Sequence, residues 1–209
     1  MLFVRDKLIV FGDATTTANS IMASESLFRI GIVVNLSAQI FSLLLGITLF
    51  RLFKDVDKRL ATVMLASVCL FVIIAIINLL NNMAALMILT KADYLNVFEP
   101  EKRNALMMMF LKLNNEGQGL LEIFWGPFLF TFGLLAIKSR FIPGILGILL
   151  IIGSFGYPIN SLTSLLIPEY RYPIIFQLTM LFGALGGIPT MFWLLIKGVK
   201  NNITTVDKK

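Results

Sequence analysis

The chain has 209 residues, of which 57% are apolar and 14% charged, and its formal net charge is +6. Soluble domains average about 25% charged residues, so this composition excludes an ordinary soluble fold and indicates a membrane protein. The sequence contains no histidine, which excludes His-based catalytic triads, His haem ligation and conventional His/Cys zinc sites.

The N-terminal segment, residues 1–25, is predicted to lie outside the membrane and to contain a short helix. Charged residues interrupt its first apolar residues, so it has neither a signal-peptide core nor a span. Asp13 is placed as an N-cap for a helix that continues through Met22. Glu25 and Arg29 then stand four residues apart, in the favourable order for an ion pair on a helix.

Five continuous apolar stretches have the length of membrane-spanning helices. A helix needs about 20 residues to cross about 30 Å of hydrocarbon, and uninterrupted apolar runs are typical of helices rather than of barrel strands. The fold class is therefore predicted to be all-α, a polytopic transmembrane helix bundle forming a single domain over residues 1–209. The predicted spans are residues 26–50, 60–89, 118–137, 142–167 and 174–196, followed by a tail of residues 197–209.

Basic residues gather in three of the segments outside the spans. The connections after spans one and three and the C-terminal tail carry ten Lys/Arg in 26 residues, against seven in 59 residues of the other segments. The positive-inside rule then predicts an external N-terminus and a cytoplasmic C-terminus. The positive charge is explained by topology, so we expect the lipid bilayer as a partner and no nucleic acid.

The longest connection, residues 90–117, contains a Met-rich helical pattern over residues 104–113. This helix either lies at the membrane interface or lengthens span three. Gly117 and Gly119 are expected to mark a joint between the two.

Proline and glycine residues mark the later spans. Pro127, Pro158 and Pro189 each remove a backbone donor, which predicts kinks at these levels. Gly183 and Gly187 form a GxxxG spacing, which either permits close helix packing or occurs by chance.

Polar side chains inside the spans gather toward the predicted external end. At 1.5 Å per residue from the cytoplasmic ends, most lie about 22 to 31 Å up or just beyond, whereas Gln39 lies about 16 Å up. We expect them to converge on one polar cavity open to the outside. The candidate ligand-binding residues are Glu122, Arg29, Asn35, Asn78, Asn81, Asn160 and Gln177.

Glu122 is the member that packing explains least well, because a charged carboxylate at that depth costs about 2.5 to 3.5 kcal/mol. It either forms a structural hydrogen bond or ion pair, belongs to a ligand or proton site with Arg29 as its counter-charge, or lies among wet headgroups. Asn78 and Asn81 are neighbours on one helical flank. Their amides serve either interhelical packing or a ligand.

Several segments of the chain resemble one known family. They are residues 8–15 (LIVFGDAT), 23–29 (ASESLFR), 49–54 (LFRLFK), 92–94 (ADY), 122–126 (EIFWG) and 194–198 (LLIKG). Together they are similar to the bacterial membrane family catalogued as domain of unknown function 4386. The resemblance implies a membrane location and fold, but no activity and no catalytic residues. It also implies one more apolar helix ahead of Leu8, so we expect the usual first transmembrane helix to be missing here.

The predicted function is binding or transport of a small ligand through the polar cavity, in a multi-pass protein of a bacterial cytoplasmic membrane. The alternative is a non-catalytic structural component that recruits another membrane protein. A lipid-modifying enzyme comes third, since Glu122 and Arg29 suit a headgroup but no nucleophile is evident. No catalytic residue, metal ligand or cofactor is identified, which disfavours an enzyme.

Overall fold

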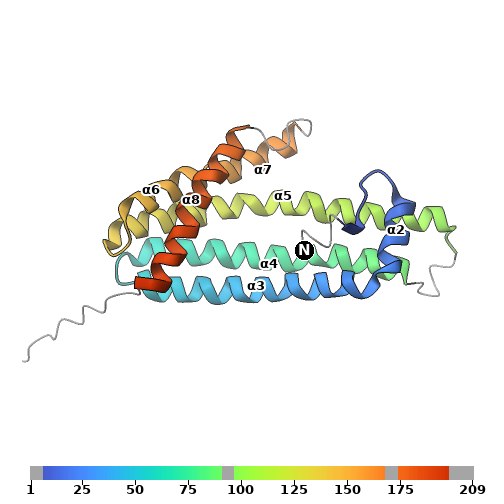
Figure 1. Cartoon of the computed structure of the whole chain (residues 1–209), viewed down its shortest axis with the longest axis horizontal. Helices are drawn as coiled ribbons and strands as arrows, with labels where there is room; N and C mark the ends of the chain where they lie inside the picture. The colour runs from blue at the N-terminus through green and yellow to red at the C-terminus, as the bar shows by residue number, and fades with distance from the viewer. Residues whose placement is uncertain (1–6, 91–96, 168–173, 198–209) are drawn as a thin grey trace, which may run out of the picture. The chain divides into compact units, whose positions relative to one another are not determined.

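The computed structural model describes residues 7–90, 97–167 and 174–197, and every regular element that it assigns in these ranges is a helix (Figure 1). The all-α prediction is confirmed. In chain order the helices are α2 (Ala14–Ala23), α3 (Glu25–Phe53), α4 (Lys58–Leu89), α5 (Pro100–Ser139), α6 (Gly144–Ser154), α7 (Gly156–Leu166) and α8 (Ile174–Lys197).

The helices have the lengths and apolarity of membrane spans. Four stretches qualify, namely Glu25–Phe53, Lys58–Leu89, Pro100–Ser139 and Gly144–Leu166. The apolar helical stretch found in α8, Leu181–Lys197, is shorter. These helices indicate a multi-pass membrane protein. The orientation of the helices and the kind of membrane stay predictions.

The third span differs from its prediction. Instead of beginning at residue 118 after a glycine joint, α5 runs without interruption over Pro100–Ser139, which is 40 residues and about 60 Å along its axis. The Met-rich pattern therefore lengthens span three, and the predicted joint at Gly117 and Gly119 is wrong. The helix continues because its residues at spacings of three and four stay buried through this region, including Met107, Leu111, Asn114 and Leu121.

The chain falls into two compact units. The first unit comprises Met1–Ile47 with Val68–Glu122, and the second comprises Thr48–Ser67 with Ile123–Lys209. Helices α3, α4 and α5 therefore contribute residues to both units. The expectation of a single domain stays a prediction.

In the first unit, α2 packs beside the ends of three longer helices. Asp13 caps α2 as predicted, since its carboxylate accepts from the Thr16 N–H at 2.8 Å. A bond from the Thr16 hydroxyl, followed by this N–H bond, lowers the pKa of Asp13. The core of the first unit is formed by buried apolar residues, namely Leu8, Ala18, Ile21, Phe28, Ala85, Leu86, Ile88, Leu89, Met107 and Leu111.

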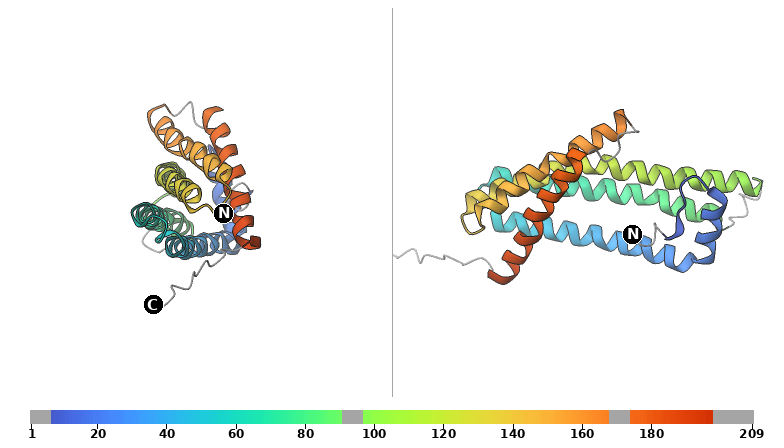
Figure 2. Two further views of the ribbon diagram at one scale, coloured as in Figure 1. Left: turned by 90° about the vertical axis from the view of Figure 1, so that its left-hand side faces the viewer. Right: turned by 45° about the horizontal axis from the view of Figure 1, so that its top comes forward.

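In the second unit, α8 crosses α6 closely (Figure 2). A methyl group added at Gly186 would lie 2.8 Å from the Leu150 nitrogen, whereas one at Gly187 would meet its nearest atom, in the Leu150 side chain, only at 4.0 Å. Gly183 and Gly186 are buried, and so is Thr190. The packing face therefore follows a spacing of three and four residues rather than the GxxxG spacing of Gly183 and Gly187, for which close packing was one of two alternatives.

The fourth span is interrupted close to a proline. It divides into α6 and α7 at Phe155, three residues before Pro158. Pro158 cannot donate to the carbonyl of Ser154, and Gly126 of α5 lies against that carbonyl and the proline ring. The kink predicted at Pro158 thus corresponds to a helix boundary. Helices α5 and α8 continue as single elements through Pro127 and Pro189.

Candidate functional site

The predicted site residues are distributed over both units. Arg29, Asn35, Asn78, Asn81 and Glu122 belong to the first unit, whereas Asn160 and Gln177 belong to the second. The structure joins Asn78 and Asn81 directly to each other. Convergence of all seven residues on one cavity stays a prediction.

Three asparagines of the first unit are hydrogen-bonded to one another where α4 packs on α5, and we call Asn78, Asn81 and Asn114 the asparagine cluster. The Asn78 side chain donates to the Asn114 carbonyl at 3.0 Å, and the Asn114 side chain donates to the Asn78 carbonyl at 3.0 Å. Asn81 donates to the side-chain oxygen of Asn78 at 3.0 Å. Asn78 and Asn114 are buried. These contacts favour the packing interpretation of Asn78 and Asn81.

Gly117 allows α5 to approach this cluster. A methyl group added to Gly117 would overlap the side-chain amide of Asn78. The glycine that suggested a flexible joint therefore provides space for a buried amide within a continuous helix.

On α3, two amide side chains pair with each other. Gln39 donates to the side-chain oxygen of Asn35 at 3.1 Å. The Gln39 side-chain oxygen is buried without a hydrogen-bond partner in the part of the chain that the structure describes. Seven residues further along, α3 approaches α4 closely, because a methyl group at Gly46 would lie 2.9 Å from the Val68 side chain.

The same pairing of α3 with α4 forms a groove at the end of the first unit. Its α3 wall consists of Arg29, Ile32 and Val33. Its α4 wall consists of Met83, Leu86, Met87 and Thr90, and the space has a volume of about 210 Å³. We call this space the Arg29 groove. The other side chains that line this space are apolar, so it is an apolar groove with one cation, Arg29, and one hydroxyl, Thr90, at its rim.

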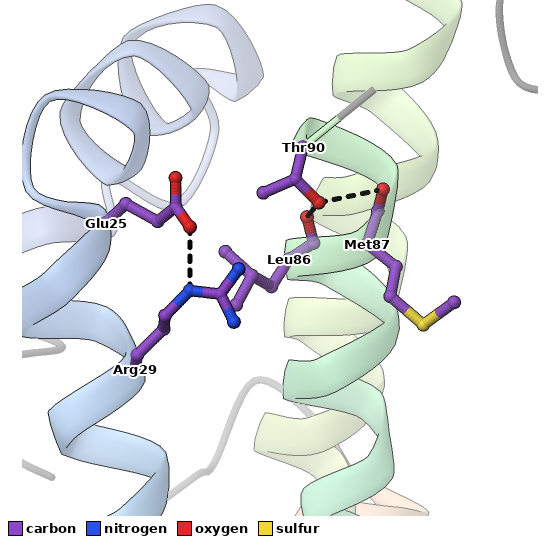
Figure 3. Close-up of polar contacts among 5 residues, drawn as sticks. All are labelled: Glu25, Arg29, Leu86, Met87 and Thr90. Carbon is purple, nitrogen blue, oxygen red and sulfur yellow. Dashed lines mark hydrogen bonds and ion pairs between the residues drawn. The ribbon is translucent and has the colours of Figure 1, made fainter. Parts of the chain in front are cut away.

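An ion pair within α3 holds the guanidinium of Arg29 at this rim. Arg29 Nε lies 2.7 Å from the Glu25 carboxylate, which confirms the predicted i, i+4 pair. Because the pair uses Nε, the two terminal nitrogens extend past Glu25 toward Leu86 and Thr90 of α4 (Figure 3). The Arg29 side chain is 56% exposed. The guanidinium can therefore contact a carboxylate or phosphate above the apolar groove.

The remaining predicted residues have different surroundings. Glu122 is half-buried and makes an interaction within the chain. Asn160 on α7 is buried, with only 2% of its surface exposed. Gln177 on α8 is exposed. None of these three lines the Arg29 groove, so their part in a ligand site stays a prediction.

The second unit has its own polar contacts at the ends of α3, α5 and α8. Lys138 lies 2.6 Å from the Asp57 carboxylate, which also accepts from the Leu60 N–H at 3.1 Å. The Lys138 bond, followed by the Leu60 bond, lowers the pKa of Asp57. The Trp193 indole donates to the Phe141 carbonyl at 2.8 Å. These contacts tie the connections after α3 and α5 and the end of α8 into one unit.

Sequence reasoning missed Asn114 and the methionines of the groove. A signal for Asn114 was present, because Met107, Leu111, Asn114 and Leu121 continue one buried helical face. Met83 and Met87 are separated by one helical turn and flank Leu86. Their position in the same groove as Arg29 depends on the register of α3 against α4, which no local pattern provides.

Residues 1–198 match the profile of a protein family described as Domain of unknown function (DUF4386). No curated protein and no solved structure matches the chain.

Proposed function

This chain belongs to the DUF4386 family, whose description assigns no activity, and we propose that it binds an anionic amphiphile in the Arg29 groove. The amphiphile is a molecule with a carboxylate or phosphate head and an apolar body. The observation that carries the proposal is the position of Arg29 at the rim of a groove whose walls are otherwise mostly aliphatic and thioether side chains. We place this groove at the external face of a bacterial cytoplasmic membrane, following the charge distribution of the connections.

The shape and charge of the groove suit such a ligand better than a polar solute. Ile32, Val33 and Leu86 offer no hydrogen bond from their side chains, so a sugar or an amino acid would lose water without compensation. An acyl chain would lose no hydrogen bonds there. Met83 and Met87 are flexible and polarisable, which allows the groove to accept chains of different shape.

Arg29 suits the head of the same ligand. A guanidinium binds a carboxylate or phosphate through two parallel hydrogen bonds. Glu25 holds Nε and so fixes the direction of the terminal nitrogens. Glu25 also offsets part of the positive charge of Arg29. A head group with strong hydrogen-bond acceptors is therefore favoured over one that is attracted by charge alone.

A transport role requires the deeper polar residues, and Glu122 is its proposed ionisable centre. If Glu122 exchanges a proton with a ligand, Glu122→Gln will abolish pH-dependent uptake into vesicles and leave binding at the Arg29 groove intact. Unchanged pH dependence in this variant would remove Glu122 from the proposal. Asn35, Asn160 and Gln177 are proposed as hydrogen-bond partners on the same route.

A structural role is the second candidate function, and the asparagine cluster favours it. Its amides bond within the pair of α4 and α5, as expected if the polar layer fixes helix packing. Purification with a stoichiometric membrane-protein partner would support this alternative.

The groove can be tested with two ligands of equal chain length, decanoate and decanol, added to the full chain in a neutral detergent. Decanoate is expected to raise the melting temperature more than decanol does. Arg29→Gln should reduce the decanoate shift to that of decanol, whereas Arg103→Gln, which removes a cation of the same unit outside the groove, should not. An unchanged decanoate shift in Arg29→Gln would overturn the proposal.

A further inference from the structure

A second groove lies along α8, in the second unit, and is independent of the proposed Arg29 site. It is lined by Ile188, Pro189, Phe192, Trp193, Ile196 and Lys197. Its apolar ridge is open, since Ile188 and Phe192 are 57% and 58% exposed. One end of this ridge carries a cation and the rest carries none, which is the charge distribution of a site for an amphiphile.

The cationic end is built around Trp193. The indole N–H is fixed by its bond to the Phe141 carbonyl at 2.8 Å, so the ring is a fixed wall of the groove. The ammonium of Lys197 lies 5.3 Å from the centre of the same ring. Lys197 is therefore ordered at the end of the groove by a cation–π contact.

A second cation belongs to the same end. Arg140 immediately precedes Phe141, so its backbone lies one peptide away from the carbonyl that Trp193 binds. Arg140 is exposed, and its φ of 59° places it in the left-handed region, which non-glycine residues rarely adopt. Arg140 is therefore the neighbour in the chain of the residue that anchors the indole, and Lys197 contacts the indole ring itself.

The charge of the second unit supports an anionic occupant. Its described residues include seven Lys/Arg and only two acidic residues, Asp55 and Asp57. Asp57 is already paired with Lys138. The described residues of the first unit, by contrast, include five Lys/Arg and six Asp/Glu. Basic residues next to a span attract anionic lipids of the cytoplasmic leaflet.

We propose that the α8 groove binds an anionic phospholipid of the bilayer. An acyl chain lies along Ile188, Phe192 and Ile196, and the phosphate lies between Lys197 and Arg140 beside the edge of Trp193. The site would select the headgroup by charge, because a zwitterionic lipid offers the same chain and phosphate but adds a positive group next to the two cations.

The fluorescence of Trp193 can report lipid binding at this groove, because the chain contains only two tryptophans. Trp125→Phe leaves Trp193 as the single tryptophan, which is excited selectively over the tyrosines. The full chain is placed in phosphatidylcholine vesicles that contain brominated phosphatidylglycerol or brominated phosphatidylcholine. Brominated phosphatidylglycerol is expected to quench Trp193 at a several-fold lower mole fraction. In the double variant Lys197→Gln with Arg140→Gln, the two brominated lipids should quench Trp193 equally. In Lys197→Arg, brominated phosphatidylglycerol should still quench at the lower mole fraction.

Equal quenching in the parent protein, or a preference that survives in the double variant, would overturn the inference. Lys112→Gln, which removes an exposed cation of the first unit, is the matched control and should keep the preference. Free glycerol phosphate is the competitor that distinguishes a lipid from a soluble phosphate ester. Free glycerol phosphate should leave the preference for phosphatidylglycerol intact. If it abolishes this preference, the occupant is not a bilayer lipid.

Discussion

Asn78 of α4 and Asn114 of α5 bind each other reciprocally, each side chain donating to the other residue's backbone carbonyl at 3.0 Å. The two residues are 36 positions apart in the sequence. Because a shift of either helix by one residue would break both bonds at once, the pair fixes the register of α4 against α5. This register also places Met107 and Leu111 against the core residues at the end of α4.

We predict that Asn78→Ala and Asn114→Ala each destabilise the protein and that their effects add. Each bond ends on a backbone carbonyl that alanine retains, so each change removes one of the two bonds and leaves the other. Each change should cost about 0.6–1.7 kcal/mol, the range found for hydrogen bonds between membrane helices. Reversible unfolding in mixed micelles measures both single variants and the double variant, with the exposed Leu113→Ala as a control. Single variants as stable as the parent would show that the bonds contribute nothing.

Gly117→Ala is predicted to destabilise the same helix pair. Its new methyl group would overlap the Asn78 amide, so either this amide must turn away and lose its bond to Asn114 or one of the two helices must shift. The free energy of unfolding should fall by about 1–3 kcal/mol, the usual cost of overpacking. Gly187→Ala is the matched control, because its methyl group meets Leu150 only at 4.0 Å and should be tolerated. Equal stability of the two variants would contradict the close approach at Gly117.

The pair of Asp57 and Lys138 is predicted to stabilise the protein in a pH-dependent manner. The pKa of Asp57 is lowered in the folded protein, first by the bond from Lys138. Its contribution is therefore complete above the ordinary Asp value of about 3.9 and disappears as pH falls through the lower folded value. Asp57→Asn should lower the melting temperature slightly at pH 7, with the difference from the parent vanishing at strongly acidic pH. A difference in melting temperature between the two proteins that grows below pH 4 would contradict this pH dependence.

Arg140→Gly is predicted to be more stable than Arg140→Ala. At a φ of 59°, a residue with a side chain is destabilised sterically by about 1–2 kcal/mol, whereas glycine is not. Glycine loses more backbone entropy on folding, so the net advantage should be about 0.5–1 kcal/mol. Chemical denaturation of both variants measures this difference. Alanine being the more stable of the two would show that the turn adopts another conformation.

Most of the fold could be predicted from local patterns. The spans now called α3 and α4 were predicted at residues 26–50 and 60–89, within three residues of Glu25–Phe53 and Lys58–Leu89. Charged residues in the connection between them mark these ends clearly. The start of α5 was missed because Lys112 and Glu116 resemble a connection, although a helix that packs against its neighbours through residues such as Leu111 tolerates charges on its exposed side.

The candidate site was predictable only in part. Spacing along one helix identified the Glu25–Arg29 pair and the proximity of Asn78 to Asn81. The partners from other helices were not identified, because only the register between helices brings Asn114 to Asn78 and places Met87 in the same groove as Arg29. That register depends on close contacts such as Gly46 with Val68, which have no periodic signature in the sequence.

The most direct test of the account is photolabelling of the Arg29 groove with a decanoate analogue that carries a diazirine on its chain. The full chain in a neutral detergent is labelled, and the modified residues are mapped by mass spectrometry. We predict that labels concentrate on Ile32, Val33, Met83 and Met87, that unlabelled decanoate removes them, and that Arg29→Gln abolishes this concentration. Labels spread evenly over the exposed apolar faces of the helices, and unaffected by Arg29→Gln, would contradict the account.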